Sequence, residues 1–287
     1  MIVNGLFLNQ PWRTSAASCP LAMRFVRRVH YLMFLYAMAI YYVMAREDSR
    51  MYMTKHPRLL ARLAGLCYVC IIVLALFAYR YVRGQLMVPG DIAQTANNIL
   101  AHERLYRLSL AAGVVVVMCN LPVGLVFYEL LKVVNRLLAL LALLFLLVAE
   151  TLEASNLLIH IQPLLTLTLR EVQGAFAADQ KLALARMSNR LFPVAFSVSL
   201  SFFGVFCFLV GCLILKAKFF PKILGVLMVL AGLCYLIDNF AGLLALPSPP
   251  FVARVPLVAE SSLALWLLIV GVNEEKWREQ ANAIPGA

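Results

Sequence analysis

Four acidic residues stand out among those inside the long apolar stretches of this chain: Glu150, Glu153, Asp238 and Glu260. An ionisable group in a membrane is costly, and it usually faces the protein interior or a water-filled cavity where it binds an ion or a polar group. We therefore predict that these carboxyl groups bind a cation, a proton or the head of a small amphiphile. In the opposing interpretation each acid lies near a helix end and reaches interfacial water. The sequence leaves both interpretations open.

Helical spacing groups two of these acids with other polar side chains. Glu153, Asn156 and His160 are separated by three and then four positions, which places them in one stripe along a helix. Glu150 lies three positions earlier, at the edge of the same stripe. The carboxyl groups and His160 could together bind a divalent metal. No H-E-x-x-H or similar pattern is present, so we predict no metal ligand, no catalytic residue and no cofactor.

Two further polar stripes come from later apolar stretches. Tyr235 and Asp238 share one helical face, and Glu260 follows Pro256 by one turn. If the three stripes face one another, they form a polar pocket among the helices. The predicted ligand-binding residues are Glu150, Glu153, Asn156, His160, Tyr235, Asp238 and Glu260.

The composition indicates a membrane protein. Of the 287 residues, 63% are hydrophobic and 14% are charged, whereas a soluble domain is nearer half apolar and a quarter charged. This composition excludes a soluble enzyme, a disordered chain and a nucleic-acid-binding domain. The net charge of +11 is then a matter of membrane topology rather than of nucleic-acid binding. The predicted partners are membrane lipid, a small ligand or ion, and further copies of the chain, but no nucleic acid.

Seven apolar stretches are candidates for crossing a bilayer, which requires about 20 residues of helix. The first, residues 29–45, is short. We predict an all-α polytopic membrane protein in which the six later stretches form a transmembrane bundle. The first stretch is either an extra N-terminal hydrophobic helix or lies before the native start of the protein. The predicted domains are then an N-terminal segment over 1–52, the six-helix domain over 53–273 and a charged tail over 274–287. The six later stretches are 63–81, 108–131, 137–158, 192–215, 223–246 and 255–272.

The connecting segments predict the orientation. Residues 80–107 form a long connector in which Asp91 is placed to cap a short helix. Residues 162–190 form another, with an amphipathic helix predicted from Asp179. Lys and Arg gather in the short turns, including Lys132, Arg136 and three lysines between 216 and 222. By the positive-inside rule, both ends of the six-helix unit, and with them the C-terminus, face the cytoplasm.

Small residues in the last three stretches predict close helix packing. Gly204 and Gly211 lie on one predicted helix, and Gly225 and Gly232 lie on the next, where small side chains let helices approach closely. Of the seven cysteines, all but Cys19 lie in apolar stretches, which argues against a disulfide framework.

Several stretches of the chain resemble a bacterial family of polytopic membrane proteins known as domain of unknown function 4386. The most specific stretch runs from Phe219-Phe220-Pro221-Lys222 through Gly232 to Asp238, and others surround Arg62 and Glu260. The resemblance covers about 55–273. It implies a six-helix unit in the bacterial cytoplasmic (inner) membrane and a natural start at Met51 or Met53. It implies no activity, cofactor or catalytic residue.

Three functions therefore remain open from the sequence. The first is binding or transport of a cation, a proton or a small amphiphile through a carboxylate pocket in the membrane. The second is a structural, sensory or partner-binding role, which the small-residue faces would serve. The third is an intramembrane enzyme that modifies lipids, with Glu150, Glu153 and His160 as acid–base or metal-binding groups. We favour the first and lean against an enzyme, because no catalytic signature is present.

Overall fold

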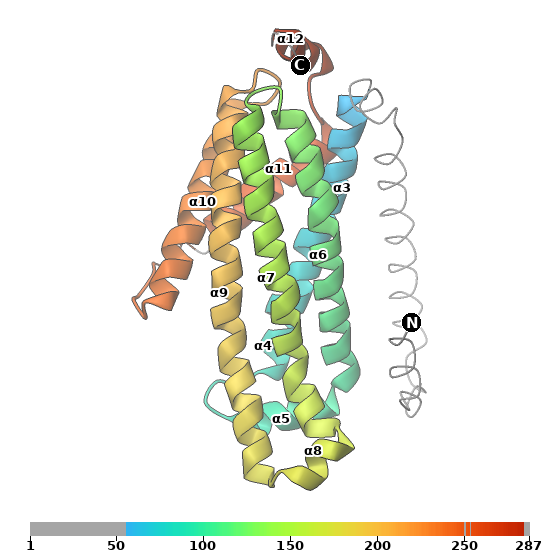
Figure 1. The fold of residues 1–287 in the computed structure, drawn as a ribbon, viewed down its shortest axis with the longest axis vertical. Helices are drawn as coiled ribbons and strands as arrows, with labels where there is room; N and C mark the ends of the chain where they lie inside the picture. The colour runs from blue at the N-terminus through green and yellow to red at the C-terminus, as the bar shows by residue number, and fades with distance from the viewer. Residues whose placement is uncertain (1–55, 250, 253, 284–287) are drawn as a thin grey trace, which may run out of the picture.

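The computed structural model describes residues 56–249, 251–252 and 254–283, and every regular element in these ranges is helical (Figure 1). The side chains of residues 170, 171 and 173 are not described. The predicted hydrophobic helix 29–45, and with it the whole predicted N-terminal domain 1–52, lies outside the described residues.

The long apolar helices confirm an all-α polytopic bundle. Five helices are long and apolar enough to cross a membrane, and a sixth qualifies if α11 is counted with α12, to which it is bent by 98°. Alone, α11 has only 15 residues and ends before Gly271, whose φ is +76°. The bundle helices are α3 (Pro57–Ala75) with its continuations η1 (Leu76–Val82) and α4 (Arg83–Leu86), α6 (Glu103–Leu131), α7 (Arg136–Thr168), α9 (Ala178–Lys216), α10 (Lys222–Leu243) and α11 (Val255–Ile269).

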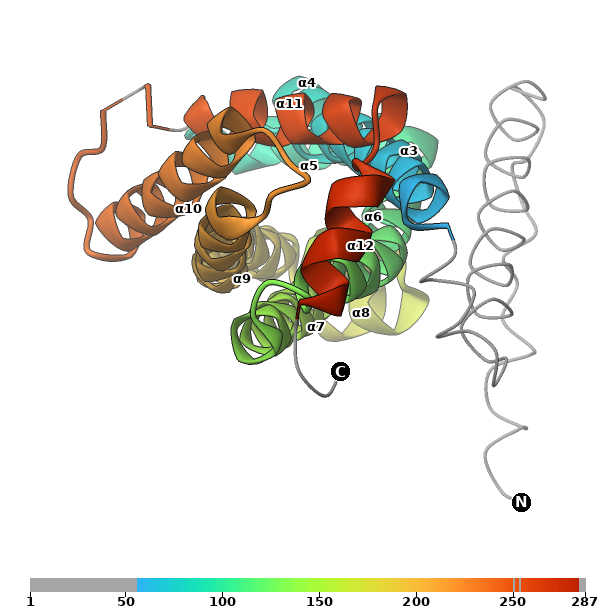
Figure 2. The same ribbon diagram turned by 90° about the horizontal axis from the view of Figure 1, so that it is seen from above.

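The six bundle helices form a closed ring. Each packs on the next in the order α3, α6, α7, α9, α10 and α11, and α11 returns to pack on α3. Seen from above, α3 and α11 lie side by side at one edge and α7 lies at the opposite edge (Figure 2). The ring encloses a central space to which all six helices present side chains.

Close packing of α9 on α10 depends on glycine, as the small-residue spacing predicts. A Cβ atom at Gly211 would lie 2.5 Å from the backbone nitrogen of Val229, and one at Gly232 would lie 2.5 Å from that of Phe208. Backbone atoms cannot move away from a new methyl group as a flexible side chain could. The two glycines therefore set the distance between these helices.

One end of the bundle is closed by a short helix. At the top of Figure 1, α12 (Glu274–Asn282) crosses the ends of the long helices, and Figure 2 shows it above α6 and α7. Asn273 caps α12 by accepting a hydrogen bond from the backbone N–H of Lys276 at 3.1 Å. The buried indole Nε1–H of Trp277 donates to the backbone oxygen of Leu130, at the end of α6, at 3.1 Å. These contacts fix α12 to the end of the bundle.

At the other end, α6, α7 and α9 continue well past α10 and α11 (Figure 1). The 39 residues of α9 correspond to about 58 Å of helix, roughly twice the thickness of the hydrocarbon core of a bilayer. The helix predicted from Asp179 is present, but it continues directly into the predicted span 192–215 and forms the first turns of α9, so no connector separates the two. Likewise α7 continues beyond residue 158 to Thr168.

Short helices pack onto these protruding ends, and together they form what we call the extension. It contains α4, α5 (Ile92–Ala101) and α8 (Arg170–Ala175). The Asp91 cap is confirmed, since its carboxylate accepts the backbone N–H of Gln94 at 2.8 Å at the start of α5. The extension has a hydrophobic core of its own, separate from that of the ring, with Val82, Leu86, Ile99, Tyr106 and Leu164 at its centre.

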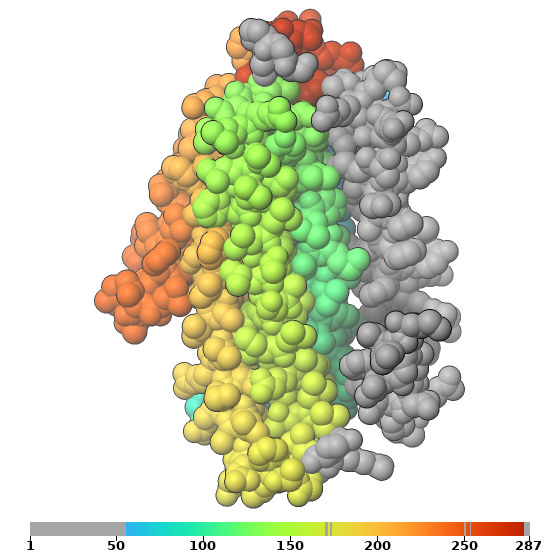
Figure 3. Space-filling model, viewed as in Figure 1, coloured from blue at the N-terminus to red at the C-terminus, as the bar shows by residue number. Residues whose placement is uncertain are grey.

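The outward faces of the ring helices are apolar. In Figure 3, α7 runs down the middle of the visible face between α6 and α9. Large apolar side chains of α7 are exposed, among them Leu137 at 73% and Leu144 at 50%. An apolar exterior around buried polar residues is the arrangement expected of helices in lipid. This agrees with a protein embedded in a membrane.

Candidate functional site

A cavity of about 320 Å³ lies inside the ring, and residues from all six bundle helices line it. Its wall is mainly apolar and aromatic, with Phe196, Leu200 and Phe203 from α9 and Ile72 from α3 among its residues. Three carboxyl groups interrupt this wall. Glu150 and Glu153 come from α7 and Glu260 comes from α11, and their exposed fractions are 6%, 5% and 8%.

Glu260 is held by two tyrosines from different helices. The hydroxyl of Tyr68 on α3 donates to its Oε2 at 3.0 Å, and the hydroxyl of Tyr235 on α10 donates to its Oε1 at 2.5 Å. Both carboxyl oxygens therefore have a donor. These two hydrogen bonds join α3, α10 and α11 at the wall of the cavity.

Glu153 is also held by neighbours. The hydroxyl of Tyr79 donates to its Oε1 at 2.7 Å, and the side-chain amide of Asn156 donates to its Oε2 at 3.3 Å. Tyr79 lies on η1, seven residues of π-helix that interrupt the first bundle helix. Leu76 and Arg80 of the same π-helical segment also line the cavity. π-Helical turns are uncommon and frequently occur at functional sites.

Glu150 differs from the other two acids because one of its oxygens has no partner. Its Oε2 is buried and receives no hydrogen bond in the described part of the chain. The Asn120 side chain on α6 lies beside the carboxyl group and also lines the cavity. A buried polar atom without a partner is rare in folded proteins and calls for an explanation, such as an unseen ligand.

The cavity reaches the surface of the ring beside η1 and α11. Leu76 on η1 and Leu257 on α11 both line it and are 43% and 44% exposed. Arg80, on the same stretch of η1, is also exposed and lines the cavity. We call these three residues the mouth. No ion pair joins the Arg80 guanidinium to Glu150, Glu153 or Glu260 in the described part of the chain.

Four predicted residues line this cavity, and a fifth touches one of them. Glu150, Glu153, Tyr235 and Glu260 all contribute to its wall, and Asn156 contacts it through Glu153. The three helices that were expected to present polar stripes therefore do contribute to one pocket.

Asp238 is not among the residues that line the cavity. It lies one turn beyond Tyr235, near the end of α10, and its Oδ1 accepts a hydrogen bond from the Ser248 hydroxyl in the following loop. Its side chain is half-buried. The structure thus places Asp238 at a helix end, where it orders the loop between α10 and α11.

His160 lies in the extension rather than in the ring. Its Nε2 is 3.1 Å from the Ser109 hydroxyl, and its ring stacks on that of Tyr106 with centroids 4.7 Å apart. The Tyr106 hydroxyl donates to the backbone oxygen of His160. His160 is only 2% exposed, and its Nδ1 has no partner in the described part of the chain. His160 packs between Tyr106 and Phe192 and does not line the cavity.

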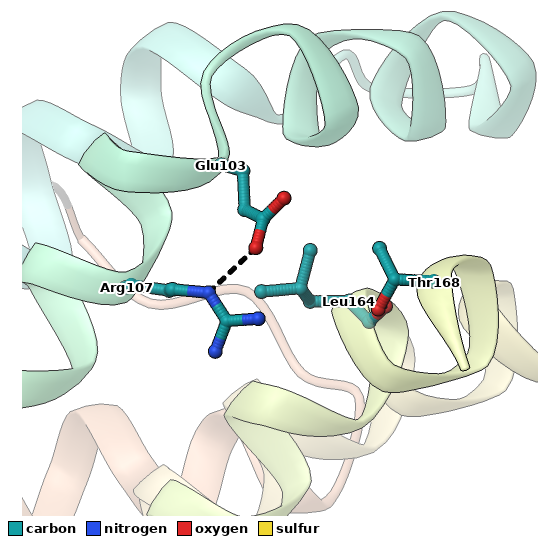
Figure 4. A network of polar contacts seen from close by, with 4 residues as sticks. All are labelled: Glu103, Arg107, Leu164 and Thr168. Carbon is teal, nitrogen blue, oxygen red and sulfur yellow. Dashed lines mark hydrogen bonds and ion pairs between the residues drawn. The ribbon is translucent and has the colours of Figure 1, made fainter. Parts of the chain in front are cut away.

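An ion pair in the extension shows how an ordinary charged pair of this protein differs from the carboxyl groups in the cavity. Arg107 Nε donates to Glu103 Oε1 at 2.7 Å in the first turns of α6, facing Leu164 and Thr168 of α7 (Figure 4). Glu103 and Arg107 are 41% and 37% exposed at their side chains. Here each charge has a partner and access to solvent, whereas the cavity carboxyl groups are buried and pair with no cation among the described residues.

Sequence reasoning did not identify Tyr68, Tyr79 or Arg80 as site residues. Tyr68 and Tyr79 are eleven positions apart, three helical turns, so their hydroxyls come to one side of the first bundle helix. This spacing in the sequence could have identified the two tyrosines as site residues. As for metals, no group of three or more His, Cys, Asp or Glu side chains in the described ranges is arranged to hold an ion.

The comparisons with known proteins identify a family. A family model described as "Domain of unknown function (DUF4386)" matches residues 63–271, which is most of the chain and all six bundle helices in whole or in part. The searches of curated proteins and of solved structures each returned no match.

Proposed function

The chain belongs to the DUF4386 family, and we propose that it binds a small amphiphile with a positively charged head in the cavity of the ring. The description of the family names no activity, so the proposal is argued from the site itself. The head would contact Glu150, with Glu153 and Glu260 nearby, and the apolar body would lie against the aromatic and aliphatic wall. The description of the family neither favours nor opposes this proposal.

The unpartnered Oε2 of Glu150 is the observation that carries the proposal. Glu153 and Glu260 already accept hydrogen bonds at both oxygens, so they need no ligand to satisfy them. Glu150 lines the cavity, and its Oε2 is buried and has no hydrogen-bond donor among the described residues. Leaving such a group unsatisfied costs about 1–3 kcal/mol, and an ammonium group would remove that cost.

The wall of the cavity favours an amphiphile over a bare inorganic ion. Ligand pockets of about 300–1,000 Å³ usually have apolar walls and a few polar groups, which describes this cavity. Two aromatic pairs lie at the wall, Tyr79 with Phe196 at 5.1 Å between ring centroids and Phe203 with Tyr235 at 5.7 Å. Aromatic faces attract ammonium groups, whereas a hydrated ion would lose its water against such a wall.

Thermal unfolding in a neutral detergent tests this function. Octylammonium and octanol share a tail and differ in the head, so octanol controls for nonspecific effects of the tail. We expect octylammonium to raise the melting temperature relative to octanol, because a ligand that binds only the folded state stabilises it. Glu150→Gln should abolish the difference between the two compounds.

The matched control is Glu103→Gln, which removes an acid from the extension, outside the cavity. It should leave the octylammonium effect unchanged. Equal shifts by octylammonium and octanol in the wild type, or an unchanged shift in Glu150→Gln, would contradict the proposed function.

We also propose that the chain lies in the cytoplasmic membrane of a bacterium with α12 and the C-terminus on the cytoplasmic side. The end of the bundle that carries α12 also carries the short basic turns between α6 and α7 and between α9 and α10. Short loops rich in Lys and Arg stay in the cytoplasm. The basic residues at these turns are Lys132, Arg136, Lys216, Lys218 and Lys222. The extension would then face the other side.

A further inference from the structure

The charges of the cavity are arranged by depth. The three carboxyl groups are buried, and Arg80, the basic residue among those that line the cavity, lies at the exposed mouth. Arg80 pairs with none of the three carboxyl groups in the described part of the chain. An acidic interior therefore lies next to a basic mouth without the two neutralising each other.

From this arrangement we infer that the ligand is a zwitterionic amphiphile, with an ammonium group that reaches Glu150 and an anionic group that pairs with Arg80. This inference rests on the proposed function and adds the second charge of the ligand. A guanidinium binds phosphate and carboxylate through paired hydrogen bonds, so either anion fits the mouth. The shared chemistry is an ammonium joined to an anion by a short linker.

The mouth residues indicate where the rest of the ligand lies. Leu76 and Leu257 border the opening and are exposed on the outside of the ring, where the helix surfaces are apolar. An alkyl chain attached to the anionic group would leave the cavity between these two side chains. The same head chemistry could come from a membrane lipid of the ethanolamine type or from a small zwitterion without a tail.

Four probes separate the contributions of the two charges and of the tail. They are octylammonium, octyl phosphate, octyl phosphoethanolamine and phosphoethanolamine without a tail. For each, we would measure the concentration that gives half of the maximal thermal stabilisation in neutral detergent. For the wild type we expect octyl phosphoethanolamine to act at a concentration about tenfold lower than octylammonium, since a charge-assisted bidentate contact is added.

Arg80→Gln is the decisive variant, because Arg80 is exposed and its replacement should not disturb the packing of the ring. It should remove the advantage of the zwitterion over octylammonium when the two compounds are compared in the variant itself. Arg136→Gln, at the exposed start of α7 at the far end of the bundle, is the matched control and should change neither compound. Octyl phosphate alone should stabilise neither the wild type nor the variants.

The outcomes distinguish this inference from the proposed function. If octylammonium binds and requires Glu150 but the zwitterion gains nothing or ignores Arg80→Gln, the zwitterion inference is wrong and the proposed function stands. If octylammonium itself does not bind, both are wrong. If phosphoethanolamine without a tail competes as well as its octyl ester, the source is a small zwitterion, and if only the ester binds, the source is a lipid.

Discussion

Tyr68 on α3 and Glu260 on α11 lie 192 positions apart in the chain and are joined by a hydrogen bond of 3.0 Å between the tyrosine hydroxyl and Oε2. Both side chains are buried, at 2% and 8% exposed. The bond links the first bundle helix to the last and so helps close the ring around the cavity. In an apolar interior the loss of a hydrogen bond to a carboxyl group leaves that group short of a donor.

Tyr68→Phe should therefore lower the stability of the protein by about 1–2 kcal/mol, measured by unfolding in mixed micelles. Tyr81→Phe is the control, because Tyr81 is 57% exposed on the same helix and should have no effect. In a Glu260→Gln background the cost of Tyr68→Phe should shrink. An equal loss of stability from Tyr68→Phe in the wild type and in Glu260→Gln would show that the Tyr68–Glu260 hydrogen bond does not cause that loss.

The α9–α10 contact provides a second test. Gly211→Ala would bring a methyl group to 2.5 Å from the Val229 backbone, so the helices must separate and the protein should lose about 1–3 kcal/mol. Gly84→Ala is the control, since a Cβ atom at Gly84 would meet nothing within 4 Å. Thermal unfolding of the two variants in detergent should separate them clearly. A Gly211→Ala variant as stable as Gly84→Ala would contradict the helix spacing described here.

The contact of Trp277 with Leu130 predicts how α12 is held. Trp277→Phe keeps a ring in the buried site but loses the Nε1–H donor, at a cost of about 1 kcal/mol. Trp277→Ala loses the ring as well and should release α12 from the bundle. Limited proteolysis should then cut the C-terminal segment faster in the alanine variant than in the phenylalanine variant. Equal cleavage of wild type and Trp277→Ala would show that Trp277 does not hold α12.

The proposed orientation predicts which surfaces can be labelled from outside an intact cell. A cysteine at Ala178, exposed at the start of α9 in the extension, should react with a membrane-impermeant maleimide. A cysteine at Lys218, exposed at the opposite end, should react only after the cells are permeabilised. The wild type gives the background of the native cysteines. The reverse pattern would place the C-terminus outside the cytoplasm.

The sequence predicted the helices well but not where they end. Apolar stretches of about 20 residues identified the spans because only a helix satisfies its backbone in lipid. The same criterion failed at the extension, where α7 and α9 run past the ends of α10 and α11 and continue as helices with a mixed surface. Polar residues there suggested connectors, although the backbone of Ala178–Lys216 is one helix.

The candidate site could be predicted only in part. Glu150 and Glu153 are one turn apart, so their common face follows from helical geometry. His160 is two turns beyond Glu153, about 10 Å farther along α7, which carries it into the extension. That Glu260 and not Asp238 lines the cavity depends on how far α10 and α11 are rotated and shifted. That rotation is set by packing between helices, which a single sequence does not encode locally.

The central claim is that an amphiphilic cation binds inside the ring and contacts Glu150, and photochemical labelling tests it most directly. An octylammonium analogue with a diazirine in its tail would be activated on the detergent-solubilised protein, and its attachment sites would be mapped by mass spectrometry. We expect adducts at cavity residues such as Phe196, Leu200 and Leu257, competed by octylammonium and largely lost in Glu150→Gln. Adducts spread over outward residues such as Leu144 and Leu230, and unchanged in Glu150→Gln, would contradict the claim.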